Sequence, residues 1–187
     1  YLTSPGKGRQ RAEIGAVVRE SDHIITAING HVHIRFIDQA LISVRPDSDL
    51  EIVQYTFDPG QPEKAAIKLN LLEGVTRSIS GKAGKMAKDR FRLNTPIVAI
   101  GIRGTDFAVS VTNNVVRALV NEGTIVLAPY SSECVAESFG PCSLDAVELS
   151  DSALQIIEFR GDAPQPRLLP LLQGPELAQE STSSEEQ

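Results

Sequence analysis

Tryptophan is absent from the sequence, and aromatic residues make up only 5% of its 187 residues. A hydrophobic core must therefore be built from Val, Ile, Leu and Ala, and the β-branched members of that set favour strands. No apolar run approaches the ~18 residues that a membrane-spanning helix needs, so we expect no transmembrane segment. No signal peptide is recognisable, and because the first residue is Tyr1 we interpret the sequence as a mature or shortened form.

Positive charge is in deficit, with 18 Lys and Arg against 24 Asp and Glu and a formal net charge of −6. An acidic protein repels a phosphate backbone, which argues against nucleic-acid binding. Catalytic motifs are also missing: there is no Gly-x-Ser-x-Gly and no Cys placed with a His in a family context. We therefore expect no enzyme activity and no cofactor, although 24 acidic residues leave a glycosidase carboxylate pair open.

The two cysteines, Cys134 and Cys142, lie in a stretch rich in Ser, Gly and Pro. A disulfide closing this short loop fits an oxidising compartment, and we predict one, together with a periplasmic or secreted location. Two unpaired thiols are the alternative. Because there is no Cys-x-x-Cys signature, these residues do not indicate a metal site.

The composition divides the chain into a flexible leader (residues 1–12), an all-β domain (residues 13–172) and a polar, Ser- and Glu-rich tail or linker (residues 173–187) that we expect to be disordered. Turn signals spaced ~8–12 residues apart predict a sandwich or roll of short, mostly antiparallel strands. Short helical turns are predicted only near Lys82–Lys88 and Leu168–Gln179. The strands that follow the first hairpin are predicted at 40–45, 50–57, 66–72, 75–80, 90–95, 98–102, 106–112, 115–121, 124–128, 145–149 and 154–159.

The clearest hairpin signal is Asn29-Gly30, because a type I′ turn needs positive φ at both central residues. A two-residue turn there pairs Ile28 with His31 and Ile24 with Arg35. This register places Ile25, Ala27, Val32, Ile34 and Phe36 on one apolar face, which we expect to point into the core.

Five segments of the sequence resemble FecR-type domains. Ser21-Asp22-His23-Ile24-Ile25-Thr26 is similar to their Gly-Asp-x-Ile-x-Thr step, Phe36-Ile37-Asp38-Gln39 to a strand ending near Asp-Gly, and Pro46-Asp47-Ser48-Asp49-Leu50-Glu51-Ile52 to Pro-x-Ser-x-Leu-x-Ile. The most specific match is Thr95-Pro96-Ile97-Val98-Ala99-Ile100-Gly101-Ile102-Arg103-Gly104-Thr105-Asp106-Phe107. It is followed by Val120-Asn121-Glu122-Gly123-Thr124-Ile125.

The resemblance spans roughly residues 14–128 and implies an all-β domain outside the cytoplasmic membrane. The best-known members of the family relay an outer-membrane iron-uptake signal to a cytoplasmic anti-sigma segment. This sequence shows no such segment, so it resembles a stand-alone or multidomain relative.

The motif residues Thr95, Pro96, Gly101, Thr105 and Phe107 are interpreted as structural. Arg103 has two interpretations. Its guanidinium could contact a carboxylate of a partner, or Gly104 could allow a tight bend that Arg103 locks through backbone carbonyls or Asp106. We favour the structural interpretation.

A basic loop stands out in this acidic protein, and it supplies the candidate binding residues. The functional interpretation is a patch for an anionic glycan, a lipid head group or an acidic partner, and the alternative is a solvated loop. It is not a phosphate-binding P-loop because its second glycine comes too early. The candidate residues are Lys82, Lys85, Lys88, Arg90 and Arg92.

The three histidines do not predict a metal site. His31 and His33 have the spacing of a shared strand face, but the predicted hairpin places His23 on the opposite face. We therefore expect no bound metal.

Three functions remain open at this stage. The leading hypothesis is a non-catalytic extracytoplasmic module that binds an envelope protein or an anionic glycan through loops and sheet edges. The second is a periplasmic signalling regulator of the anti-sigma type whose membrane and cytoplasmic parts lie outside this sequence. The third is a structural spacer within a larger surface protein.

Overall fold

The computed structural model describes residues 1–151, 154–171 and 176–177. Its named helical elements are a short α-helix, α1 (Lys82–Met86), and two 3-10 turns, η1 (Pro62–Lys64) and η2 (Lys88–Arg90), and residues 176–177 are also helical. All other named elements are strands: β1 (Leu2–Thr3), β2 (His23–Ile25), β3 (Val32–Arg35), β4 (Leu41–Val44), β5 (Asp49–Thr56), β6 (Ala66–Ile79), β7 (Phe91–Asn94), β8 (Val98–Ile102), β9 (Asp106–Thr112), β10 (Val115–Glu122), β11 (Thr124–Pro129), β12 (Val147–Ser150), β13 (Gln155–Arg160) and β14 (Arg167–Pro170). The all-β prediction is confirmed.

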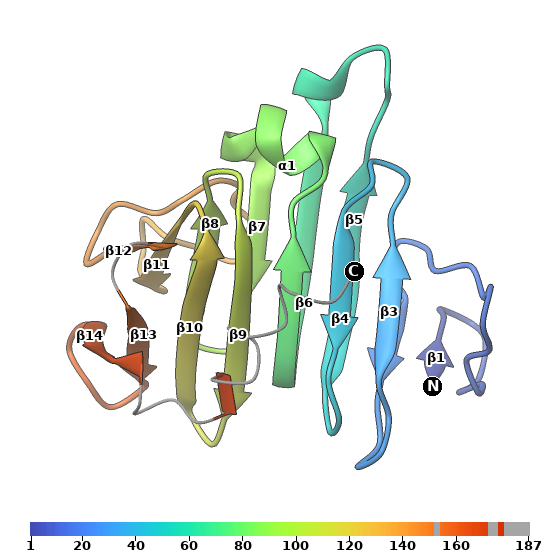
Figure 1. Ribbon diagram of the computed structural model, residues 1–187, viewed down its shortest axis with the longest axis horizontal. Helices are drawn as coiled ribbons and strands as arrows, with labels where there is room; N and C mark the ends of the chain where they lie inside the picture. Colours follow the sequence, from blue (N-terminus) through green and yellow to red (C-terminus); the bar gives the residue numbers. More distant parts are fainter. Residues whose placement is uncertain (152–153, 172–175, 178–187) are drawn as a thin grey trace.

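The strands form two sheets that share β6. Sheet A contains β1, β2, β5, the first half of β6, β7, β8, β11 and β12, whereas sheet B contains β3, β4, the second half of β6, β9, β10, β13 and β14. Strand β6 passes between the sheets at Gly74, whose φ of +88° suits glycine. Figure 1 shows β3, β4, β6, β9 and β10 side by side, with α1 above them.

The main core lies between the two sheets. Strand residues alternate between the two faces of a sheet, so the inward set on β6 is Ile67, Leu69 and Leu71, each at most 3% exposed. Inward residues of β9, such as Val109, belong to the same buried cluster. The cluster is dominated by Ile, Val and Leu, as the shortage of aromatic residues requires.

The chain crosses between the sheets at two rows of corners. In the first row (residues 26–31, 45–48 and 73–75) the Thr26 hydroxyl donates to the Arg45 carbonyl at 2.6 Å and accepts from the Ser48 amide at 2.9 Å. The Ser48 hydroxyl accepts from the Val75 amide at 2.9 Å. These bonds tie three successive crossings together.

The second row of corners (residues 103–105, residues 122–123 and Asp151) joins β8 to β9, β10 to β11, and β12 to the segment before β13. The amide of Gly123 donates to the Asp151 carboxylate at 3.0 Å, and the amide of Arg103 donates to the Thr124 carbonyl at 2.9 Å. The amide of Ser80, at the end of β6, donates to the Thr105 carbonyl at 2.8 Å, so β6 ends at this row.

The predicted hairpin at residues 22–36 is wrong. Strand β2 pairs with β1 and β5 in sheet A, whereas β3 pairs with β4 in sheet B. Neither Asn29 nor Gly30 has a positive φ, so there is no type I′ turn and the segment forms a corner instead. The inward residue of β2 is therefore Ile24, at 2% exposure, and not Ile25, and Ala27 is exposed. Ile34 and Phe36 are buried as predicted, and Val32 is partly buried.

Most other strands lie where the sequence predicts them, and β8 and β9 have the predicted bounds. The two strands predicted at 66–72 and 75–80 are one continuous element, β6. Residues 1–12, predicted as a flexible leader, include β1, which pairs with β2. The helical turn predicted at 168–179 is wrong over residues 168–170, which lie in β14, whereas residues 176–177 are helical. The predicted tail lies outside the described residues except for Glu176 and Leu177.

Gly101 on β8 provides a direct test of the packing on the outer face of sheet A. A Cβ atom there would lie 2.7 Å from the Cα of Pro141, a backbone atom with little room to move. We expect Gly101→Ala to lower the free energy of unfolding by about 1–3 kcal/mol through overpacking, measured by urea titration. Gly8→Ala is the control, since nothing lies within 4 Å of a Cβ at Gly8. Equal stabilities of the two variants would contradict this packing.

Candidate partner-binding surface

Four of the five predicted basic residues share one exposed surface beside the second row of corners. Lys82 and Lys85 lie on α1, and Lys88 and Arg90 lie on η2. All four residues are exposed, and the guanidinium of Arg90 also donates to the Ala65 carbonyl at 3.1 Å. Met86, an apolar side chain that is 59% exposed, lies on the same short connection. We call these five residues the basic surface.

The basic surface lies on the connection between β6 and β7, which pair in parallel and so require a crossover. Asp38, only 1% exposed, fixes its start. The carboxylate of Asp38 accepts from the Ala83 amide at 3.1 Å and from the Tyr55 hydroxyl at 2.7 Å. Burial, together with the bond to Asp38, raises the pKa of Tyr55. With Ala83 buried, the lysines of α1 face solvent.

The fifth predicted residue, Arg92, does not belong to this surface, and its assignment to an exposed loop is wrong. It lies on β7, between the inward residues Phe91 and Leu93, so its side chain points to the outer face of sheet A. Residues 131–146, which we call the disulfide loop, cover that face. Arg92 is only 1% exposed as a result.

Three side chains of sheet A hold the disulfide loop through its backbone carbonyls. Arg92 donates to the Phe139 carbonyl at 3.3 Å, and Asn94 donates to the Ala136 carbonyl at 3.0 Å. Lys68 donates to the Glu137 carbonyl, and its ammonium lies 4.2 Å from the centre of the Phe139 ring. Sequence reasoning missed Lys68, yet its position between Ile67 and Leu69 on a strand indicates the same outward face as Arg92.

The disulfide loop is closed by a disulfide between Cys134 and Cys142, whose Cα atoms lie 5.6 Å apart. Cys134 is fully buried against Ala99 and Ala128 on the outer face of sheet A, whereas Cys142 is partly exposed. The disulfide therefore closes the loop, and both hydrogen bonds and apolar packing hold the loop against sheet A.

The family-like motif of residues 95–107 is structural over most of its length. Thr95 caps its own turn, since its hydroxyl accepts from the Val98 amide at 3.0 Å. Pro96 follows in that turn. Gly104 has a φ of +67°, as the predicted bend requires. Phe107 is 1% exposed and packs edge-on against Phe91.

The interpretation of Arg103 as the lock of this bend is wrong. Its side chain is 56% exposed and contacts Glu148 at 3.5 Å. Asp106 is held instead by Arg77, at 2.6 and 2.8 Å. In the sheet register Arg77 on β6 lies opposite Ala108 on β9. Asp106 is two residues before Ala108 and lies on the same face of β9, so the Arg77 side chain can reach it diagonally across the two strands.

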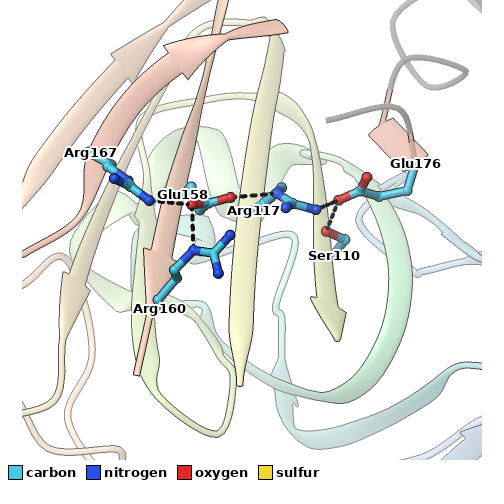
Figure 2. A network of polar contacts seen from close by, with 6 residues as sticks. All are labelled: Ser110, Arg117, Glu158, Arg160, Arg167 and Glu176. Atoms are coloured by element: carbon cyan, nitrogen blue, oxygen red, sulfur yellow. Dashed lines mark hydrogen bonds and ion pairs between the residues drawn. The ribbon is translucent and has the colours of Figure 1, made fainter. Parts of the chain in front are cut away.

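A second polar network lies on the outer face of sheet B (Figure 2). Glu158, 3% exposed, accepts from Arg117 at 2.9 Å and from Arg160 and Arg167 at 3.0 Å each. Arg117 also donates to Glu176 at 2.6 Å. Burial would raise the pKa of Glu158, but the hydrogen bonds from the three arginines outweigh it and lower that pKa to about 2. Such a carboxylate cannot serve as a proton donor near neutral pH.

The histidines lie in separate places. His23 contacts Asp49 at 3.1 Å in sheet A, whereas the ring of His31, just before β3, lies 4.3 Å from the ring of His33 on β3. Across the described residues, no group of three His, Cys, Asp or Glu side chains is arranged to hold a metal ion. In the same part of the chain, no helix is both long and apolar enough to cross a membrane.

Together these features define a two-sheet, all-β domain with an exposed cationic connection between β6 and β7. The sequence profile of the FecR protein family matches residues 22–126, more than half of the chain. The chain belongs to the FecR family.

Two crystal structures from Parabacteroides distasonis, each described as that of a "putative anti-sigma factor", have a similar fold. Their TM-scores are 0.55 and 0.54, at 12% sequence identity in both cases. The match covers 79% of this chain and 59% of theirs, so the chain spans well under two thirds of those proteins. At this identity the likeness shows the fold alone. No curated protein matches the sequence.

The Glu158 network predicts a specific dependence of stability on pH. Because the pKa of Glu158 is lower in the folded protein than in an unfolded chain, its contribution is fully present above about pH 5 and is lost as the pH falls towards 2. We expect Glu158→Gln to lower the free energy of unfolding at pH 7 by on the order of 2–3 kcal/mol. The difference from wild type should shrink steadily below pH 5 in urea titrations. A difference that does not change with pH would contradict this account.

Proposed function

We propose that this FecR domain is a non-catalytic, extracytoplasmic signalling module that acts by binding an acidic protein partner through the basic surface. The observation that carries the proposal is the exposure of Lys82, Lys85, Lys88 and Arg90 in a protein whose net charge is −6. The cationic surface attracts an acidic region of a partner, whereas the acidic remainder of the molecule repels it. The charges therefore orient the partner as well as bind it.

Met86 favours a protein over a glycan as the partner. An exposed methionine among cations offers a polarisable, adaptable apolar contact of the kind found at protein-binding surfaces. A purely anionic glycan would use the lysines and leave this side chain without a matching group. The chemistry therefore fits a partner surface with an apolar centre and an acidic rim.

Signalling is favoured over the alternative of a structural spacer by the family assignment and by the description of the two similar structures. The disulfide supports an extracytoplasmic location, because such bonds persist in oxidising compartments. A non-catalytic role is supported by the arginine contacts of Glu158, which is buried, and of the partly exposed Glu176, because these contacts hold both carboxylates in the ionised form.

The proposal can be tested in the bacterium that makes the protein, by placing a photo-crosslinking amino acid at position 86. We expect a discrete crosslinked species that weakens as salt rises, since exposed charges are screened. The triple variant Lys82→Glu, Lys85→Glu, Lys88→Glu should reduce its yield at least tenfold. The same crosslinker at Ile28, an exposed position at the first row of corners, should give no such species.

A matched control separates the basic surface from overall charge. Lys7, Arg11 and Arg35 are exposed residues away from α1, and changing all three to Glu alters the net charge by the same amount. The control variant should retain the crosslink. On the chromosome, the Lys82, Lys85 and Lys88 variant should reproduce the transcript changes caused by deleting the gene. If the Lys82, Lys85 and Lys88 variant crosslinked as strongly as the wild type, the basic surface would not be the binding site. If deletion of the gene changed no transcript, the signalling role would be refuted.

A further inference from the structure

We propose that the Cys134–Cys142 disulfide is a thiol–disulfide exchange site, poised by Arg92 for reduction by a dithiol partner. This inference does not depend on the proposed function, because it concerns the outer face of sheet A and not the basic surface.

The guanidinium of Arg92 lies directly against both sulfur atoms. Its Nη1 atom is 3.2 Å from Sγ of Cys142 and 3.8 Å from Sγ of Cys134. A disulfide sulfur is a weak acceptor, so these contacts are poor substitutes for the hydration that a guanidinium loses on burial. The Nε atom of Arg92 has no hydrogen-bond partner within the part of the chain that is described.

No described carboxylate forms a salt bridge with Arg92, although it is the largest of the fully buried side chains. Burial accordingly lowers the pKa of Arg92, yet a guanidinium stays protonated at neutral pH. A second cation, Lys68, lies on the neighbouring strand. Burial is the main cause that lowers the pKa of Lys68, and the charge of Arg92 is the next. Among the described residues, the oxidised protein thus holds a buried positive charge that no carboxylate pairs with.

Reduction supplies the missing counter-ion. A thiolate that forms beside a cation is stabilised relative to a free thiolate, which favours the reduced form of the pair. Arg92 should therefore make the disulfide easier to reduce than one in a neutral environment. Replacing the arginine by an uncharged residue should make the disulfide harder to reduce, because the substitution removes the stabilisation only from the reduced state.

The exchange is chemically balanced with a dithiol as reductant. A thiolate of the dithiol attacks Sγ of Cys142, the partly exposed sulfur, and the bond to Cys134 breaks as Cys134 leaves as a thiolate beside Nη1 of Arg92. The second thiol of the dithiol then attacks its own sulfur in the mixed disulfide and releases Cys142. Two electrons and two protons pass to the cysteine pair, and the dithiol is oxidised to its cyclic or intramolecular disulfide.

Reduction also has a structural consequence that can be measured. Besides its apolar packing, the disulfide loop is held to sheet A by three side-chain hydrogen bonds to carbonyls within the described part of the chain, from Lys68, Arg92 and Asn94. Without the covalent closure the loop gains conformational entropy in its open state. Lys68 is a residue only 8% exposed in the oxidised protein, and its amine should then become accessible to acylating reagents.

The test measures the equilibrium between the full chain and dithiothreitol in mixtures of its reduced and oxidised forms, with thiols counted by alkylation and mass spectrometry. We expect Arg92→Leu to shift the equilibrium constant towards the disulfide at least tenfold, which corresponds to about 30 mV for a two-electron couple. Arg92→Lys keeps the charge and should recover part of this shift. Arg35→Leu, an exposed arginine on sheet B, should leave the constant unchanged. An Arg92→Leu constant within twofold of wild type would overturn the proposal.

Two measurements on the wild-type protein keep the proposal testable even if Arg92→Leu does not fold. In the reduced protein, the rate of Cys142 alkylation as a function of pH should give a thiol pKa below the ordinary value of about 8.5. Acylation of Lys68 should increase at least fivefold on reduction, whereas acylation of exposed Lys7 should not change. A thiol pKa at or above the ordinary value, or a Lys68 that stays protected, would show that the disulfide is an inert staple.

Discussion

The hydrogen bonds of Thr26 and Ser48 hold together the row of corners on which the rest of the structure depends. The Thr26 hydroxyl accepts a hydrogen bond from the Ser48 amide at the next crossing of the chain, and the Ser48 hydroxyl accepts one from the Val75 amide at the crossing after that. Corners interrupt the regular pairing of strands, so their amides need other partners. Because these side chains supply them, β6 can leave sheet A and enter sheet B within one continuous strand.

The same arrangement explains the position of the basic surface. Since β6 changes sheets at Gly74, its end returns to the level of the second row of corners, where Ser80 bonds to Thr105. The parallel partner β7 then requires a crossover, and α1 and η2 form it. The exposed lysines are therefore carried on a short connection fixed at one end by the buried carboxylate of Asp38. The segments that resemble FecR motifs include these structural residues, Thr26, Asp38, Ser48 and Gly104, and not the proposed contact residues.

Strand positions were predictable from sequence because the alternation of apolar residues reports directly on the inward face. That alternation does not report what covers the outward face. Arg92 and Lys68 occupy outward positions that a strand pattern assigns to solvent, and only the folded disulfide loop buries them. Asn29-Gly30 likewise indicates a reversal of the chain but not the partner of the following strand, which lies in the other sheet. The role of Arg77 was invisible because its carboxylate partner, Asp106, is 29 residues away in sequence.

The most direct test of this account is a double-mutant cycle on Thr26→Val and Ser48→Ala, with unfolding free energies measured in urea. If the corner bonds form one connected unit, the two changes should be coupled by about 1 kcal/mol or more, within the range seen for residues in one hydrogen-bond network. The expected sign is that the second change costs less once the first bond is lost. Effects that add to within about 0.3 kcal/mol would contradict the claim that this row of corners holds the two sheets together.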